Sequence, residues 1–302
     1  MQLRVNIFNT SSNLPLLAAQ AAGYFARRGL QIEIQHTPNS DAQRAGLAAG
    51  SFEIAHAAVD NAVAMVEAGQ DVVIVLGGDA GMNEFMVRQE INAIEDLRGK
   101  VLAVDAPNTA YALVAKKILK NHGLLENRDY TVRLAGGTAA RAAAMVADPQ
   151  LAAGMINPPF SFTVRAQGLK SLGNQFKLLG PYQATGAFVL RGWARAHADL
   201  LQNYLAAYIE GQRHVMNPAH RADMIALLMR SFKLDGTAAA GTLDALLTPG
   251  AGLTPDARFN LEGFQTVLAI RAELEGVWGG TAPAPQKYLD LSHFDRAIQK
   301  CQ

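Results

Sequence analysis

Short apolar runs alternate with amphipathic segments through most of the chain, and this alternation predicts its elements. Strands are expected at 3–8, 30–35, 52–57, 71–78, 85–89, 101–106, 130–135, 152–157, 176–180 and 186–190, and helices at 14–29, 40–50, 60–69, 109–123 and 138–147. The run "DVVIVLGG" at 71–78 is continuously apolar, as in a strand covered by helices on both faces. The pattern therefore predicts an α/β fold with mainly parallel sheets.

Capping residues mark where several of these helices begin. Ser40, Asp60, Thr109 and Thr138 stand where a side-chain oxygen can accept the first free backbone N–H groups. We expect all four to be N-caps, each contributing about 1 kcal/mol to its helix.

The character of the chain changes after Arg191. Only helical patterns follow, at 195–217, 219–231, 236–247 and 255–276. The glycine-bearing segments 77–83 and 180–186 each join two predicted strands and are the expected crossovers between two lobes. We expect residues 1–80 with 185–302 to form one lobe, residues 81–184 to form the other, and a ligand cleft to lie between them.

Composition excludes several classes of function. The chain has 302 residues and a formal net charge of +1, without a dense basic cluster, so no nucleic-acid partner is expected. Its one cysteine, Cys301, excludes an internal disulfide and a cysteine metal cluster. No apolar run reaches the length that spans a bilayer, so we expect no membrane insertion. Strand-like sequence begins at Leu3, so we expect no signal peptide in this sequence, which is then either cytosolic or a mature exported form.

The sequence carries no recognisable catalytic or cofactor motif. Phosphate-binding loops, the dinucleotide glycine pattern and the nucleophile elbow are missing, and the seven histidines form no metal-binding pair. We therefore expect no cofactor, no metal and no catalytic residue. His56, at the end of a predicted strand, is the one histidine placed near the cleft, and a structural role is favoured for it over that of a general base.

Six segments in order carry a family resemblance. They are "GYFARRGLQIEI" (23–34), "AGLAAGSFEIAHA" (45–57), "VEAGQDVVIV" (66–75), "EDLRGKVLAV" (95–104), "LVAKKILKNHGL" (113–124) and "NPPFSFTVRAQGLKSLG" (157–173). Together they resemble the nitrate, sulfonate, taurine and thiamine-precursor group of periplasmic solute-binding proteins of ABC importers, which have the type II fold. Glu53 and Asn174 stand where that group usually has aspartate, at positions that are not expected to touch ligand.

The resemblance implies a two-lobe fold in which each lobe is a mainly parallel sheet flanked by helices, with extra C-terminal helices. It implies a periplasmic monomer that captures a small solute by hinge closure and delivers it to an ABC transporter permease. The ligand would be a sulfonate, a carboxylate, a nitrate-like anion or a thiamine-pathway pyrimidine.

Ligands of open α/β sheets bind beyond the carboxyl ends of the strands, where helix N-termini meet. The polar residues at these junctions and crossovers are our candidate ligand contacts: Asn9, Ser11, Asn39, Ser40, Asp60, Asp79, Thr109, Tyr111, Thr138, Asn157 and Thr185. Capping alone explains several of them without a ligand. Asp60 and Asp79 would repel an anion, which favours a ligand with an amine or ring N–H donors.

Two alternatives remain open at this point. The first is an enzyme on the same scaffold, a lyase or hydrolase acting on a small aromatic or carboxylated substrate through carboxylates and His56. Enzymes on this fold that depend on cysteine are excluded because Cys301 is the only cysteine. The second is a cytosolic ligand sensor, against which the missing N-terminal DNA-binding helices argue.

Overall fold

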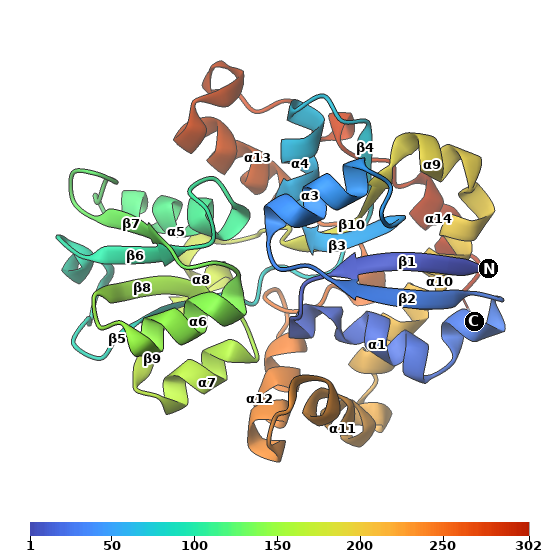
Figure 1. Cartoon of the computed structure of the whole chain (residues 1–302), viewed down its shortest axis with the longest axis horizontal. Coiled ribbons are helices and arrows are strands. Elements are labelled where there is room, and N and C mark those ends of the chain that lie inside the picture. Colours follow the sequence, from blue (N-terminus) through green and yellow to red (C-terminus); the bar gives the residue numbers. More distant parts are fainter. Residues whose placement is uncertain (302) are drawn as a thin grey trace.

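The computed structural model describes residues 1–301 and contains two five-stranded sheets that lie side by side (Figure 1). The first sheet has the order β2 (Gln31–His36), β1 (Gln2–Ile7), β3 (Ile54–Ala58), β10 (Thr185–Leu190) and β4 (Val72–Leu76). The second has the order β7 (Thr131–Leu134), β6 (Val101–Val104), β8 (Leu151–Ile156), β5 (Glu84–Arg88) and β9 (Leu169–Asn174). The alternating pattern of the sequence therefore produces two sheets of matching design.

Each sheet holds one strand that runs against its two neighbours. β10 is antiparallel to β3 and β4, and β5 is antiparallel to β8 and β9, whereas β1 and β6 pair with their neighbours in parallel. Both antiparallel strands are the ones that the chain enters after it leaves the other sheet. The expected crossover at 77–83 does join two strands, β4 and β5.

The second crossover differs from its prediction. Residues 176–180 were expected to be a strand, but they lie mainly in helix α8 (Gln175–Leu179), so this crossover joins a helix to β10. The Asn174 side chain accepts a hydrogen bond from the backbone N–H of Lys177 and caps that helix. β9, directly before it, was not predicted, because a short apolar run does not by itself distinguish a strand from a helix.

Seven helices pack around the strands that precede β9. They are α1 (Leu14–Ala21), α2 (Tyr24–Arg27), α3 (Ser40–Ala48), α4 (Asp60–Glu67), α5 (Ala110–Asn121), α6 (Thr138–Ala147) and α7 (Phe160–Ala166). The single helix predicted at 14–29 is wrong, since Gly23 adopts a left-handed conformation with φ of 73° and separates α1 from α2. The break turns Phe25 into the core of the first sheet.

The N-caps also differ from the prediction, because three of the four residues lie one position inside their helices and the fourth does not cap its helix with its side chain. α3 begins at Ser40, and the preceding Asn39 is its cap, accepting the backbone N–H of Ala42 at 2.8 Å. Asp60 and Thr138 are likewise the first residues of their helices. Thr109 occupies the cap position of α5, but its hydroxyl donates to the Ala106 carbonyl instead of capping the helix.

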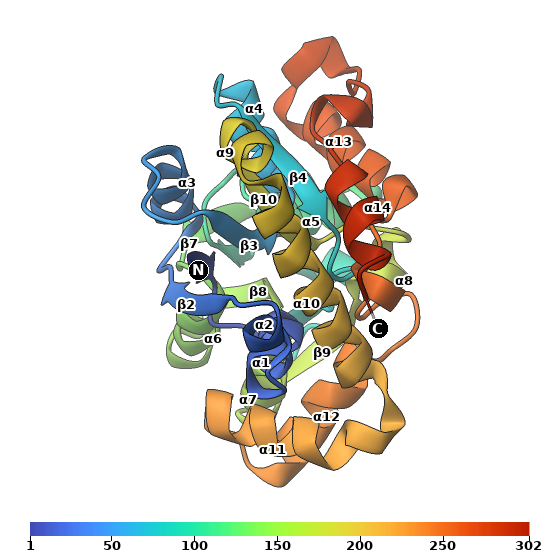
Figure 2. The ribbon, with the colours of Figure 1, turned by 90° about the vertical axis from the view of Figure 1, so that its right-hand side faces the viewer.

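Helices complete the C-terminal third of the chain (Figure 2). They are α9 (Arg191–Ala196), α10 (Ala198–Met216), α11 (Arg221–Phe232), α12 (Gly236–Leu246), α13 (Leu261–Glu275) and α14 (Ser292–Ile298). α10 packs along α1 and carries buried tyrosines against the first sheet, whereas α13 reaches across to α5 beside the second sheet. Within residues 1–301, no helix is long and apolar enough to cross a membrane.

Candidate ligand-binding site

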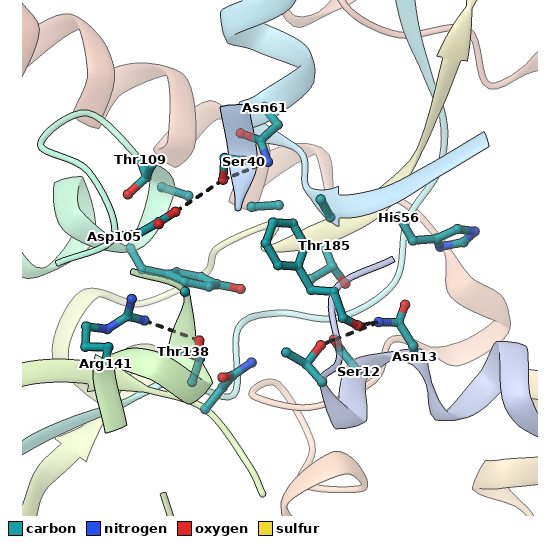
Figure 3. A pocket seen from close by; sticks show the side chains of 18 of the residues that line it. Ser12, Asn13, Ser40, His56, Asn61, Asp105, Thr109, Thr138, Arg141 and Thr185 are labelled. Carbon is teal, nitrogen blue, oxygen red and sulfur yellow. Dashed lines mark hydrogen bonds between the residues drawn. The ribbon is translucent and has the colours of Figure 1, made fainter. Parts of the chain in front are cut away.

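A cavity of about 70 Å³ lies between the two sheets, room for about five water molecules (Figure 3). Residues of both sheets and of α10 line it: Phe8, Thr10, Ser12, Asn13, Ser40, His56, Ala57, Ala58, Asn61, Asp105, Thr109, Ala110, Tyr111, Gly137, Thr138, Arg141, Asn157, Thr185 and Tyr208. Most of the polar atoms among them are hydroxyls and amides. The walls are therefore suited to a small polar solute.

Four helices begin at the cavity wall. Ser40 opens α3, Asn61 lies in the first turn of α4, Ala110 opens α5 and Thr138 opens α6. The free N–H groups and the dipole of a helix create a positive field at its N-terminus. Because α3 and α4 pack on the first sheet and α5 and α6 on the second, the field at the cavity is positive from both sides and favours an anionic group.

The loop after β1 supplies one wall. It forms a short 3₁₀ turn at Ser11–Asn13, and the hydroxyls of Thr10 and Ser12 are 2.7 Å apart. Asn13 donates its amide N–H to the Phe8 carbonyl at 2.8 Å, which fixes the loop around the cavity.

Arg141 is the one positively charged residue of the cavity lining, and it is only 2% exposed. Its guanidinium donates to the carbonyls of Met155 and Gly136 and to the Thr138 hydroxyl. Burial lowers the pKa of Arg141 to about 10. The side chain therefore stays charged at neutral pH, and it contributes a cation to the wall formed by the second sheet.

Asp105 follows β6 and is the acidic residue of the same wall. Ser40, from the other side of the cavity, donates its hydroxyl to Asp105 Oδ2 at 3.3 Å. The Asn61 amide lies 3.5 Å from the Ser40 hydroxyl and continues this chain (Figure 3). The two sheets are thus bridged at the rim of the cavity.

His56 lines the cavity but makes aromatic contacts. Its Nε2 lies 2.7 Å from the Tyr204 hydroxyl, and its ring stacks on Tyr208 with centroids 4.8 Å apart. Burial lowers the pKa of His56 to about 3, so the imidazole is neutral at physiological pH. No carboxylate of the described residues forms an ion pair with it.

The structure brings part of the candidate set together. Those that line the cavity are Ser40, Thr109, Tyr111, Thr138, Asn157 and Thr185. Among them, Asn157 is notable because no donor within residues 1–301 reaches its Oδ1 atom, which is buried. Burial raises the pKa of Tyr111, so its hydroxyl is a neutral donor at the cavity wall.

Three candidates from the loops lie outside the lining. Asn9 is exposed, and Asn39 is exposed while its side chain caps α3. Ser11 is fully buried and donates its hydroxyl to the Pro158 carbonyl at 2.7 Å, a contact between the loops that follow β1 and β8.

The two acidic candidates also lie outside the lining, and each has a partner in the protein. Arg271 donates to both carboxylate oxygens of Asp60, at 2.9 and 2.8 Å. Asp79 accepts from the Thr185 hydroxyl and from the Gly81 N–H, and burial raises its pKa to about 6. Neither carboxylate lines the cavity, so an anion bound there would not be in direct contact with the two residues that were expected to repel it.

Sequence reasoning missed several lining residues. Thr10, Ser12 and Asn13 line the cavity, whereas the proposed Asn9 and Ser11 are their neighbours in the same loop. The prediction chose the wrong residues because the conformation of a loop has no periodic signal in the sequence. Arg141 did carry a signal, because "TAARAAAMVA" places one arginine among alanines on a helix face that would otherwise be buried. Asp105 stands at the end of an apolar strand, where the same rule that selected Asn157 applies.

Comparison with known proteins adds a family and a fold. The family model described as NMT1/THI5 like matches residues 10–221. Among curated proteins, no sequence matches the chain.

Several solved structures share the fold over nearly the whole chain. The alkanesulfonate-binding protein SsuA from Xanthomonas axonopodis pv. citri, bound to MOPS, has a TM-score of 0.76 and 21% identity, with 95% of this chain and 96% of that one covered. The periplasmic nitrate-binding protein NrtA from Synechocystis PCC 6803 has a TM-score of 0.80 and 13% identity, with 99% and 88% covered. A ligand-binding component of an ABC-type import system from Staphylococcus aureus has a TM-score of 0.83 and 12% identity, with 98% and 99% covered. At these identities the likeness establishes the two-sheet type II fold, which confirms the fold that the sequence predicted.

Proposed function

The chain belongs to the NMT1/THI5-like family, and from that premise we propose that it is the solute-binding component of an ABC importer. Its ligand would be a small organic solute with an anionic group, such as a sulfonate or a carboxylate, or a nitrate-like anion. It would act in the periplasm as a monomer and deliver the solute to the transporter's permease.

One observation carries this proposal. The N-termini of α3, α4, α5 and α6, which come from both sheets, surround a single cavity that also holds the buried cation of Arg141. Hydroxyls and amides supply the remaining polar atoms of the wall. A small anion placed there would accept hydrogen bonds from both sheets at once, which is the requirement for a ligand that holds two lobes together.

The mechanism that we propose is hinge closure between the lobes 1–80 with 185–302 and 81–184. The crossovers at 77–83 and 180–184 would be the hinges, since they connect the two sheets. Ligand contacts from both sides of the cavity would stabilise the closed state. The size of this stabilisation is set by how much more tightly the ligand binds the closed state than the open one.

Catalysis on the same scaffold has less support. An enzyme of the kind considered above needs a carboxylate with a perturbed pKa in contact with His56. His56 instead contacts Tyr204 and Tyr208, and the perturbed carboxylate of Asp79 is bonded to Thr185 and Gly81. These contacts favour a binding role for the cavity.

Thermal unfolding against a panel of sulfonates, carboxylates, nitrate, amines and pyrimidines tests the proposal. A ligand at 100 times its Kd adds about 2.7 kcal/mol to the free energy of unfolding, which is a readable shift. We expect at least one anionic compound to give such a shift and to be recovered unchanged. Conversion of the compound would establish an enzyme instead, and a panel without any shift would contradict the proposed ligand class.

A further inference from the structure

Helix α13 connects the two halves of the molecule at a place outside the cavity lining. It lies between α4, beside the first sheet, and α5, beside the second (Figure 1). α13 packs directly on α5, so this contact crosses from one half to the other. Buried apolar residues of both helices belong to one core cluster, which gives the contact an apolar base.

Two sets of contacts fix α13 to the side of the first sheet. Near its start, the backbone N–H of Asn260 donates to Gln183 Oε1 at 2.7 Å, within the second crossover. About 12 Å further along the helix axis, Arg271 donates to both carboxylate oxygens of Asp60, the first residue of α4. The helix therefore begins at a proposed hinge and moves with α4 beyond it.

Arg271 also connects α13 to the second half, next to the cavity. Its Nη2 donates to the Asn108 carbonyl at 3.2 Å, in the loop before α5. The residue after Asn108 is Thr109, which lines the cavity. On the other side, Asp60 directly precedes the lining residue Asn61 (Figure 3). Moving α5 away from α4 to open the cavity would therefore pull Asn108 away from Arg271.

Glu273 lies about half a turn further along α13 and forms ion pairs with two lysines of α5. Its carboxylate oxygens contact Lys117 Nζ at 2.6 Å and Lys120 Nζ at 2.9 Å. Hydrogen bonds from these lysines lower the pKa of Glu273, so its carboxylate is charged at neutral pH. The three side chains are between 22% and 39% exposed, so dissolved salt can screen their attraction.

We infer that α13 is a strap between the lobes and that Glu273 shifts the balance between open and closed states without touching the ligand. This inference rests on the hinge closure of the proposed function and adds a determinant of ligand affinity to it. The ion pairs hold α5 against α13 and are lost when the cavity opens. Because the ligand binds the closed state, its apparent affinity scales with the fraction of closed molecules.

Distances between two spin labels measure this balance without any ligand. Ala49→Cys, directly after α3, and Ala143→Cys, in α6, place one label at an exposed position of each lobe, and Cys301→Ser removes the one native cysteine. We expect Glu273→Gln to lengthen the mean distance by raising the ratio of open to closed molecules about two- to fivefold, because partly exposed ion pairs are weak. Sodium chloride at about 1 M should lengthen the distance in the wild type and have little further effect on Glu273→Gln.

Glu126→Gln is the matched control. Glu126 also pairs with a lysine of α5, Lys116 at 2.7 Å, but both residues belong to the second lobe, so the distances should not change. Glu273→Lys should open the molecule further because it repels two lysines. Lys117→Glu and Lys120→Glu in the same chain should then restore the wild-type distances, since the exchanged charges attract again.

Unchanged or shorter distances in Glu273→Gln, an equal change in Glu126→Gln, or no recovery in the charge-exchanged chain would overturn the inference. Hinge closure itself is tested separately, by whether an anion of the panel that shifts thermal unfolding also shortens the label distance in the wild type. If it does so while Glu273→Gln changes nothing, the proposed function stands and the strap does not.

Discussion

At the scale of single residues, the two buried carboxylates near the cavity both have hydrogen-bond partners within the protein. Asp60 is neutralised by Arg271, and Asp79 accepts two hydrogen bonds but has no cation within ion-pair distance among the described residues. Both were candidate ligand contacts from the sequence. Sequence position correctly placed them at strand ends and crossovers, but it could not reveal Arg271 and Thr185, the partners that lie more than a hundred residues away along the chain.

The Asp79 carboxyl should make stability depend on pH. Burial raises its pKa in the folded state from 3.8 to about 6, so the folded protein binds a proton more tightly than the unfolded chain does. The stabilisation is present below pH 4 and is lost as the pH rises through 6, by about 3 kcal/mol at most. We expect Asp79→Asn to lack this loss, which urea unfolding of both proteins between pH 4 and 7 measures. Parallel curves for the two proteins would contradict the assignment.

The Asp60–Arg271 pair should be costly to break. Arg271→Leu leaves Asp60 buried without its cation, and we expect a loss of about 3 to 5 kcal/mol in the free energy of unfolding. Arg44→Leu is the control, because it breaks the pair of a partly buried arginine with the exposed Asp41 and should cost less than about 1 kcal/mol. Similar urea midpoints for the two variants would show that the buried pair contributes little.

At the scale of elements, the sequence predicted most strands and helices but not their ends or their interruptions. The apolar run at 71–78 was found because both faces of β4 are buried. The break at Gly23 was missed because alanine-rich periodicity continues across it, and α8 was missed because its five residues are too few for a helical period. The four expected capping residues located the starts of α3, α4, α5 and α6 to within one residue, which is the accuracy that capping chemistry allows.

The packing of α10 on α1 depends on a glycine. A Cβ at Gly211 would lie 2.3 Å from the Pro15 carbonyl oxygen and 2.7 Å from the Ala19 Cβ, so Gly211→Ala should destabilise the protein by about 1 to 3 kcal/mol. Gly192→Ala, in α9, meets no atom within 4 Å and should be neutral or stabilise by up to about 1 kcal/mol. Thermal unfolding of both variants checks this contrast, and equal Tm values would refute the close approach of the two helices.

At the scale of the whole molecule, the ordered motifs of the sequence identified the family and the fold, and the family match confirmed that resemblance. The cavity lining was only partly predictable. Its residues come from loops and helix starts in both sheets, and their side-chain directions are set by packing between segments far apart in the sequence. The buried charge of Arg141 in particular follows from the way α6 packs against β8.

Closure between the two lobes should be visible in solution. The Ser11–Pro158 and Ser40–Asp105 contacts join the two sides of the cavity, and in the proposed closed state a ligand would add further bonds between them. We expect a saturating ligand to decrease the radius of gyration measured by small-angle X-ray scattering and to narrow the range of radii that the molecules adopt. An unchanged scattering curve with bound ligand would contradict hinge closure.

The most direct test of the central claim is calorimetric titration of the selected ligand into the wild type and into Ala58→Phe. Ala58 ends β3 at the cavity wall, so we expect a phenyl ring there to take up ligand space without replacing any polar lining group. The account predicts that the wild type binds one ligand per chain and that the folded variant binds at least about a hundredfold more weakly, a loss of about 2.7 kcal/mol. Equal affinity of the two proteins would place the ligand elsewhere and contradict the account.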